Sequence, residues 1–245
     1  MARGAAKIRL YVASPLAAGA SVALDRDQAR YLFSVMRLGP GDEVLLFNGA
    51  DGEWRARVAE AGKKGGALEV AEQTRPQTLP PDLWLMFAPI KKARTDFIAE
   101  KAAEMGVRRI LPVFTRFTNS ERVNADRLAA HCIEAAEQCG LVSVPEVSGP
   151  QSLEAALADW PADRRLMFCD ETAAHGEAAA ALSAAGGDKW AILIGPEGGF
   201  APEEVARLRG LDVATPVSLG PRILRADTAA VAALTIWQAT LGDWR

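Results

Sequence analysis

The 245-residue sequence has few of the side chains that build metal sites and disulfides. It contains three cysteines, at positions 132, 139 and 169, only two histidines, and no C-x-x-C pair. Cys132 and Cys139 lie seven residues apart in one helical pattern, where cysteine packs as a small apolar residue. We therefore expect neither a metal site nor a structural disulfide.

Several common catalytic and nucleotide-binding motifs are also missing from the sequence. It has no G-x-G-x-x-G, no G-x-x-x-x-G-K-[ST] and no G-x-S-x-G, which argues against a dinucleotide-binding fold, a P-loop and a hydrolase nucleophile elbow. Its longest apolar run, around residues 228–237, is far shorter than a bilayer span. We expect a cytoplasmic protein with no membrane partner.

Charge is unevenly distributed along the chain, although the formal net charge is only −3. Residues 1–122 carry 19 Lys and Arg against 14 Asp and Glu, a net charge of +5, and residues 123–245 carry 9 against 17, a net charge of −8. A polyanion would meet the first half. Solvated protein faces also vary by this much, so both interpretations stay open.

The hydrophobic pattern changes once along the chain. Residues 1–73 contain short alternating segments about ten residues apart, with a helical pattern over residues 25–36, and predict a small β-barrel. Residues 74–81 are proline-rich and predict a linker. From residue 82 to 245 strand and helix patterns alternate, which predicts an α/β domain with a mostly parallel sheet.

Two glycine-bearing turns near the C-terminus predict the functional site. An apolar strand ends at Ile194 and meets Gly195-Pro196, and a second strand ends at Leu219 and meets Gly220-Pro221. Asp227 or Thr228 is the predicted N-cap of the helix that follows. Because parallel strands bind ligands at their carboxyl ends, and glycine permits close backbone approach, we expect a ligand pocket here.

Four stretches carry a resemblance to a known family: I-G-P-E-G-G-F at 194–200, S-L-G-P-R-I-L-R-A-D-T-A at 218–229, E-A-A-E-Q at 134–138 and Y-L-F-S-V-M-R-L at 31–38. With these stretches, the chain resembles the RsmE family of SPOUT methyltransferases over essentially its whole length. The resemblance implies an N-terminal PUA-like RNA-binding barrel and a C-terminal SPOUT domain whose trefoil knot holds S-adenosylmethionine. Members of that family methylate N3 of a uridine in 16S ribosomal RNA, so the implied partner is 16S RNA within the small ribosomal subunit.

The residues of these loops suit a pocket for that methyl donor, because glycines permit backbone contact with its adenosine. Loop 169–171, which ends another strand, is a further candidate for the pocket. The expected cofactor contacts are Ile194, Gly195, Glu197, Gly198, Gly199, Leu219, Gly220, Ile223 and Leu224.

Methylation at N3 requires removal of a proton and stabilisation of charge on the flanking carbonyls. Arg225 is the candidate stabiliser, and Glu197 and Asp227 are the candidate bases. The alternatives are that Glu197 binds ribose and that Asp227 only caps its helix. The candidate RNA contacts, which are otherwise solvated charges, are Arg30, Arg37, Lys91, Lys92, Arg94 and Arg222.

The resemblance also implies a homodimer, because SPOUT enzymes pair through helices beside the cofactor site. The last helix places Ala230, Leu234, Trp237 and Leu241 on one face, which either meets a second copy or packs on its own sheet. Two alternatives for the function remain: a SPOUT enzyme that modifies another RNA position, such as a ribose 2′-hydroxyl, or a non-catalytic ribosome-assembly factor.

Overall fold

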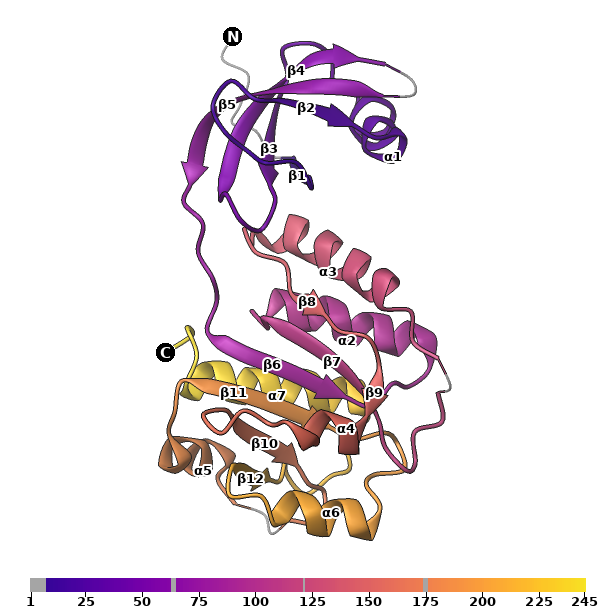
Figure 1. The fold of residues 1–245 in the computed structure, drawn as a ribbon, viewed down its shortest axis with the longest axis vertical. Helices are drawn as coiled ribbons and strands as arrows, with labels where there is room; N and C mark the ends of the chain where they lie inside the picture. The colour runs from indigo at the N-terminus through magenta and orange to yellow at the C-terminus, as the bar shows by residue number, and fades with distance from the viewer. Residues whose placement is uncertain (1–7, 63–64, 121, 174–175) are drawn as a thin grey trace. The chain divides into compact units, whose positions relative to one another are not determined.

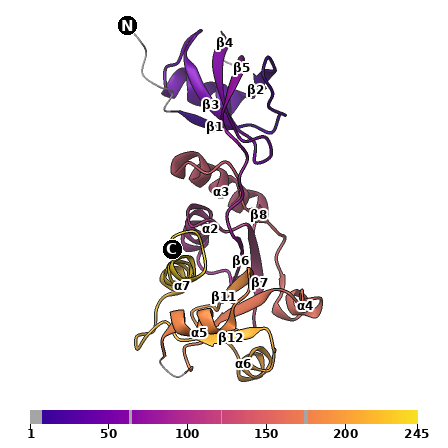
Figure 2. The same ribbon diagram turned by 90° about the vertical axis from the view of Figure 1, so that its left-hand side faces the viewer.

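The computed structural model describes residues 8–62, 65–120, 122–173 and 176–245. The chain divides into two compact units, which are drawn from two sides in Figures 1 and 2. Unit 1 contains the chain up to Leu79 together with Ala136–Ser143, and unit 2 contains Pro80–Ala135 and Val144–Arg245. The sequence pattern had assigned residues 136–143 to the second domain.

Over its described residues, unit 1 forms a five-stranded sheet in the order β1-β3-β4-β5-β2. β1 runs parallel to β3, and the other pairs are antiparallel. The strands are β1 (Arg9–Tyr11), β2 (Ser21–Leu24), β3 (Glu43–Phe47), β4 (Glu53–Ala61) and β5 (Gly66–Arg75). β5 therefore continues two residues into the segment expected to be a linker, because Thr74 Oγ1 donates to the Glu53 carbonyl at 3.1 Å and Arg75 binds the Glu53 side chain.

The helical pattern at residues 25–36 folds as a short α-helix, α1 (Arg26–Ala29), continued by a π-helix, η1 (Arg30–Val35). Asp25 accepts hydrogen bonds from the backbone of Asp27 and Gln28, and the Gln28 side chain binds back in a capping box. Ala29 and Leu32 lie in the core of the sheet. Apolar spacing predicted the helix, whereas the wider π turn has no signature in that spacing.

The buried carboxylate of Glu53 binds Arg9, which in turn binds the backbone of residues 136–141 within unit 1. Glu53, which is 4% exposed, binds Arg9 at 2.8 Å and Arg75 at 2.6 Å. Burial acts to raise the pKa of Glu53, but hydrogen bonds from Arg75, Arg9 and Thr74 outweigh it and lower the pKa. Arg9 in turn donates to the carbonyls of Ala136, Glu137 and Leu141. These bonds explain why residues 136–143 belong to unit 1.

Unit 2 is an α/β sandwich, as the alternating pattern predicted. Its described residues form a seven-stranded sheet in the order β12-β10-β11-β6-β7-β8, with β9 also paired to β7, and all pairs are parallel. The strands are β6 (Asp82–Phe87), β7 (Arg109–Phe114), β8 (Glu146–Val147), β9 (Gln151–Ser152), β10 (Arg165–Cys169), β11 (Lys189–Ile194) and β12 (Ala214–Val217).

Helices cover both faces of this sheet (Figure 2). One face packs against α2 (Lys92–Glu104), the first part of α3 (Ala125–Cys139), α5 (Ala178–Ala185) and α7 (Ala226–Thr240). The other packs against α4 (Leu153–Ala158) and α6 (Pro202–Arg209). Asn124 caps α3, since its side chain accepts a hydrogen bond from Arg127 N at 2.9 Å. None of the described helices is both long and apolar enough to cross a bilayer.

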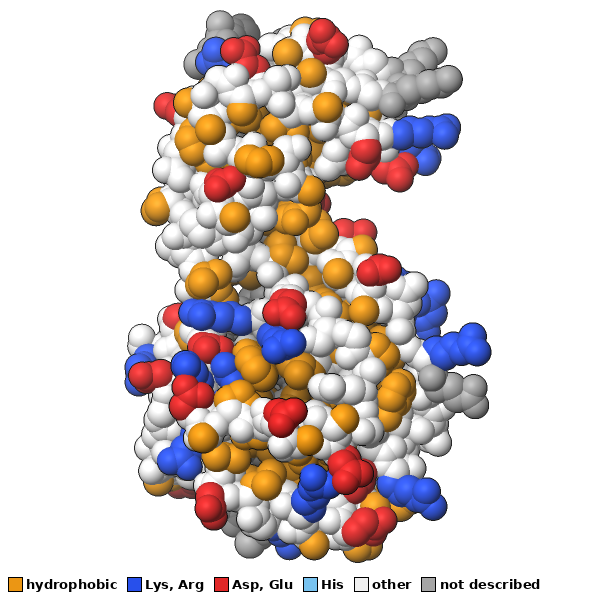
Figure 3. Space-filling view, viewed as in Figure 1, with side chains coloured by type: hydrophobic (Ala, Val, Ile, Leu, Met, Phe, Trp, Pro, Cys, Tyr) orange, Lys and Arg blue, Asp and Glu red, His pale blue; other side chains and the backbone are white. Residues whose placement is uncertain are grey.

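The apolar face of α7 packs on its own sheet. Ala230, Leu234 and Trp237 are buried in the unit 2 core, and Leu241 is half-buried against it. The interpretation of this face as a surface for a second copy is therefore wrong. Charges of both signs are interspersed over the unit 2 face seen in Figure 3.

Candidate active site

A cavity of about 270 Å³ opens where β10, β11 and β12 end. This volume is close to the lower end of the range for small-molecule sites. Three loops, one after each strand, form its wall. The lining residues are Cys169, Asp170, Glu171, Thr172, Ile194, Gly195, Pro196, Gly199, Phe200, Val205, Val217, Ser218, Leu219, Gly220, Pro221, Arg222, Ile223, Leu224, Ala226 and Ala229. The carboxyl edge of a parallel sheet is where ligand sites form in open α/β folds.

The glycine loop after β11 is tightly packed. A Cβ on Gly195 would lie 2.7 Å from the Phe200 ring, and one on Gly199 would lie 2.8 Å from the Glu171 carboxylate. Gly199 also has a φ of +70°, which glycine adopts without strain. Phe200 in turn packs edge-on against Phe168, with ring centroids 5.1 Å apart. Packing against Phe200 therefore requires a glycine at 195, and the positive φ favours one at 199, whereas the sequence interpretation assigned Gly199 to close approach of a ligand.

Glu204 fixes the far end of this loop. It lies in the first turn of α6, where one carboxylate oxygen accepts from Ala201 N and the other from Arg116 N, both at 2.9 Å. A carboxylate in the first turn also interacts favourably with the helix dipole. The bond to Arg116 ties the loop after β7 to the loop after β11.

The glycine loop after β12 is open. Gly220 has a φ of +107°, and a Cβ there would meet nothing within 4 Å. Pro221 and Arg222 are exposed, and the Ile223 side chain is 84% exposed. Leu219 and Leu224 are half-buried on the cavity wall. This wall therefore offers apolar surface that the protein itself does not cover.

The loop after β10 supplies a buried charge. Asp170 is 3% exposed and accepts hydrogen bonds from Thr172 N, Thr172 Oγ1 and the Arg209 guanidinium at 2.6–2.9 Å. Burial acts to raise the pKa of Asp170, yet these bonds prevail and hold the pKa below its usual range. Burial raises the pKa of the neighbouring Cys169 thiol to about 12, so that thiol stays neutral.

The predicted cofactor contacts largely meet in this cavity. Ile194, Gly195, Gly199, Leu219, Gly220, Ile223 and Leu224 all line it. Glu197 and Gly198 are exposed on the turn between Pro196 and Gly199 and are not among the lining residues.

Two of the three predicted catalytic residues, Arg225 and Asp227, lie at the start of α7, whereas Glu197 lies on the turn after β11. Arg225 is the N-cap and is exposed, and its side chain makes no hydrogen bond or ion pair with any described residue. The prediction of Asp227 or Thr228 as N-cap is wrong, because the helix begins at Ala226. Asp227 lies in the first turn, where its Oδ2 is 3.6 Å from Arg94 Nε. A carboxylate there also complements the helix dipole.

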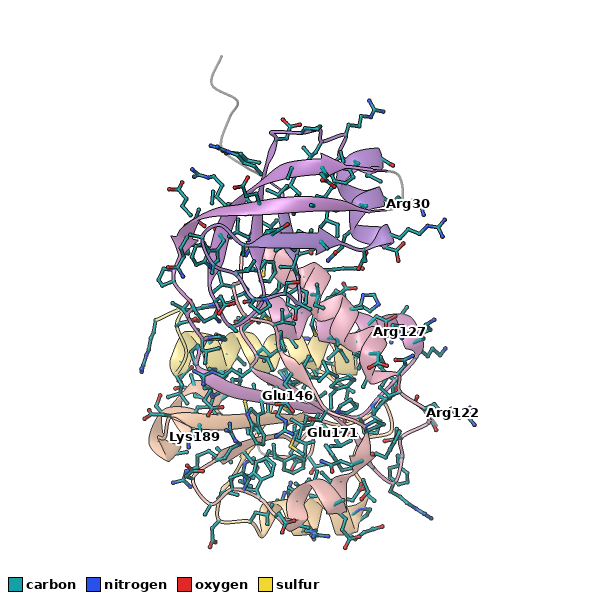
Figure 4. The ribbon with its side chains drawn as sticks, turned by 45° about the horizontal axis from the view of Figure 1, so that its top comes forward. Arg30, Arg122, Arg127, Glu146, Glu171 and Lys189 are labelled. Carbon is teal, nitrogen blue, oxygen red and sulfur yellow. The ribbon has the colours of Figure 1, made fainter. Side chains whose placement is uncertain are left out.

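The candidate RNA contacts are divided between the two units. Arg30 and Arg37 are exposed in unit 1, and Arg37 has an unusual positive φ of 59° just after the π-helix. Lys91 and Lys92 are exposed at the start of α2. Arg94 is instead paired with Asp227. Figure 4 labels Arg30 on unit 1 and Glu171 at the cavity loop.

Two family models match the chain. The model of an RNA methyltransferase domain matches residues 77–238, and the model of an RNA methyltransferase PUA domain matches residues 24–70. The second match agrees with the expected PUA-like domain in unit 1.

Relatives match over nearly their full length. Ribosomal RNA small subunit methyltransferase E of Rickettsia conorii is 30% identical over 228 residues, which cover 92% of this chain and 93% of the relative. A methyltransferase of Legionella pneumophila, solved with its cofactor SAM bound, superposes with a TM-score of 0.85 at 28% identity, over 96% of this chain and 98% of that one.

A second solved structure, ribosomal RNA small subunit methyltransferase E of Neisseria gonorrhoeae bound to S-adenosyl methionine, has a TM-score of 0.84 at 26% identity, over 97% and 99% of the two chains. The sequence motifs, the α/β sandwich and the cavity where its two glycine loops meet all agree with these matches. The chain belongs to the RNA methyltransferase family, with the ribosomal RNA small subunit methyltransferases E among its relatives.

Proposed function

We propose that this protein methylates N3 of a uridine in the 16S ribosomal RNA of the small ribosomal subunit, in the cytoplasm, with S-adenosylmethionine as methyl donor. The observation that carries the proposal is the cavity at the carboxyl ends of β10, β11 and β12. Two of the four stretches that carry the family resemblance, 194–200 and 218–229, contribute residues to its wall. The relatives from Legionella and Neisseria, whose folds match this chain, bind that same donor.

The residues of the cavity suit an adenosine-containing ligand. Ile194, Leu219 and Leu224 supply apolar surface for a base, and the backbone of Gly195 and Gly220 supplies polar groups without side chains in front of them. The uncovered Ile223 would close over the ligand from the open loop. When bound, S-adenosylmethionine supplies an electrophilic methyl group on a sulfonium centre.

The chain's own residues would manage the charge that develops on the uracil ring. Loss of the N3 proton spreads negative charge onto the two flanking carbonyl oxygens, and Arg225 has a guanidinium free of other described partners to bind it. Asp227 and Glu197 remain the proposed proton acceptors. Glu171 joins them as a third candidate, because its carboxylate belongs to the cavity wall.

The deciding experiment compares 16S ribosomal RNA nucleosides from a deletion strain with those from its parent and from a complemented strain. We expect 3-methyluridine to disappear on deletion and to return on complementation. Loss of a 2′-O-methylated nucleoside instead would establish the rival reaction, and an unchanged nucleoside profile would favour a non-catalytic assembly factor.

We propose that Arg30 and Arg37 of unit 1 bind RNA phosphates, together with Lys91, Lys92 and Arg222. Neutralising phosphates releases counterions, so affinity should fall steeply with salt. Reversing the charge of Arg30 and Arg37 together should flatten that dependence and leave cofactor affinity unchanged. An unaltered salt dependence would remove both residues from the RNA site.

We also propose a trefoil knot in unit 2 and a homodimer. The strand order supports the knot, since β12 lies at the sheet edge beyond β10 while α7 returns to pack against β11 and α2. Tracing residues 190–240 in a crystal structure tests the chain path of the knot.

Light scattering at micromolar concentration tests the proposed homodimer, and a monomeric mass would exclude it.

A further inference from the structure

Phe117 is an exposed aromatic side chain on a fixed turn. It follows β7, and its side chain is 43% exposed. Thr115 and Thr118 close the turn around it: Thr115 N donates to Thr118 Oγ1 at 2.9 Å, Thr118 N donates to the Thr115 carbonyl at 3.2 Å, and the two hydroxyls are 2.9 Å apart. A large apolar ring is thus held in solvent by a turn that has little freedom to withdraw it.

The turn is attached to the glycine loop of the cavity. Glu204 accepts the backbone N–H of Arg116, the residue before Phe117, at 2.9 Å. A Cβ on Gly198 would lie 3.1 Å from the Phe117 Cβ. Phe117 therefore lies directly beside Gly198, whose neighbour Gly199 lines the cavity, but it is not itself among the lining residues.

The same turn presents positive charge. Arg116 is exposed, and its guanidinium makes no hydrogen bond or ion pair with any described residue. Further along the loop, Arg122 is also exposed, and Figure 4 shows it extending outward. An aromatic face beside an unpaired guanidinium is the combination that binds single-stranded nucleic acid, because bases stack on the ring and phosphates bind the cation.

We propose that Phe117 is a stacking platform for an unpaired RNA base next to the methylated uridine, with Arg116 on the adjoining phosphate. The inference rests on the proposed function. In a base pair, N3–H of uridine donates a Watson–Crick hydrogen bond, so only an unpaired uridine can be methylated at N3. When that uridine leaves the base stack, the neighbouring bases lose a stacking partner. Because Phe117 lies beside the cofactor cavity and outside its wall, the base that it stacks is a neighbour of the uridine that receives the methyl group.

The test uses the full-length protein with small ribosomal subunits purified from the deletion strain. Phe117→Ala should lower kcat/KM for the subunits by roughly 5- to 150-fold, the range that one base–aromatic stack represents. Most of the loss should appear in KM. Phe117→Trp should retain activity, and Phe117→Leu, which is apolar but has no ring, should recover little of it.

Two further measurements separate stacking from a structural role. S-adenosylmethionine affinity, measured by calorimetry without RNA, should be unchanged in all three variants. Phe97→Ala is the matched control, since Phe97 is 39% exposed on α2 of the same unit and should leave kcat/KM unchanged. Full recovery by Leu, or a parallel loss of cofactor affinity, would assign Phe117 to packing of the glycine loop.

The outcomes also distinguish this inference from the proposed function. If wild-type protein produces no 3-methyluridine in the subunits, the proposed function fails. If wild-type protein produces it and Phe117→Ala matches wild type in kcat/KM, the function stands and the stacking platform is overturned.

Discussion

The two glycine loops that form the cavity begin with the same Gly-Pro turn but differ in how the protein supports them. In the loop after β11, added Cβ atoms at Gly195 and Gly199 would lie within 3 Å of other side chains. In the loop after β12, a Cβ at Gly220 would meet nothing within 4 Å, and Ile223 is largely exposed. The first loop is therefore shaped by the folded protein alone, and the second is left to be covered by what binds.

The strongest test of the packed loop is Gly199→Val. The positive φ of Gly199 opposes a branched side chain whatever the surrounding space, so the backbone of the turn must change. We expect S-adenosylmethionine affinity, measured by calorimetry, to fall at least about 100-fold, the scale of roughly 3 kcal/mol of strain. Gly149→Val is the control, since Gly149 has open space and no positive φ. Normal cofactor binding by Gly199→Val would mean that this loop is not preformed.

Arg225→Ala tests the residue that follows the open loop. Because its guanidinium has no described partner in the protein, its removal should leave cofactor affinity within a few fold. Turnover should fall by roughly 10²-fold, the scale for losing one transition-state stabiliser. Arg225→Lys, which retains charge without the planar fork, should restore only part of the rate. Equal losses of affinity and turnover would show that Arg225 shapes the pocket instead.

Asp170→Asn tests the support behind the packed loop. Asp170 has a lowered pKa in the folded protein, so its ionised form stabilises the fold above its ordinary pKa, and that stabilisation is lost as pH falls through the lowered value. At about pH 7 the variant should lose about 1–3 kcal/mol of unfolding free energy in urea titrations. The difference from wild type should shrink toward about pH 3, near or below the ordinary aspartate pKa. A difference that is constant with pH would contradict the charge argument.

Ile223→Ala should have the smallest effect. The side chain is mostly in solvent, so the unfolding free energy should change by less than about 0.5 kcal/mol. If a bound ligand covers it, affinity should fall by roughly 5- to 30-fold, since burying such a side chain contributes about 1–2 kcal/mol. Leu79→Ala, another exposed apolar residue, is the control for affinity. An unchanged affinity for both cofactor and RNA would mean that the open loop stays uncovered.

Local sequence patterns predicted much of the fold. The short alternating segments of residues 1–73 and the strand and helix alternation from residue 82 correspond to the two observed sheets, because alternation and apolar runs act over a few neighbouring residues. The glycine turns likewise lie at strand ends, and seven of the nine predicted cofactor contacts line the cavity. Glu197 and Gly198 do not, because the turn projects them into solvent.

By itself, the sequence determined the α/β alternation, the Gly-Pro turns that end two strands and the resemblance to one methyltransferase family, since each is written in contiguous residues. Only the tertiary structure decided which charges meet. Arg209 binds Asp170, which is 39 residues away in sequence. Arg9 donates to the carbonyl of Leu141, which is 132 residues away, and Arg94 pairs with Asp227. The physical reason is that partners distant in sequence are chosen by the path of the chain through the sheet. The same path crowds one glycine loop and leaves the other open, although both begin with the same two residues.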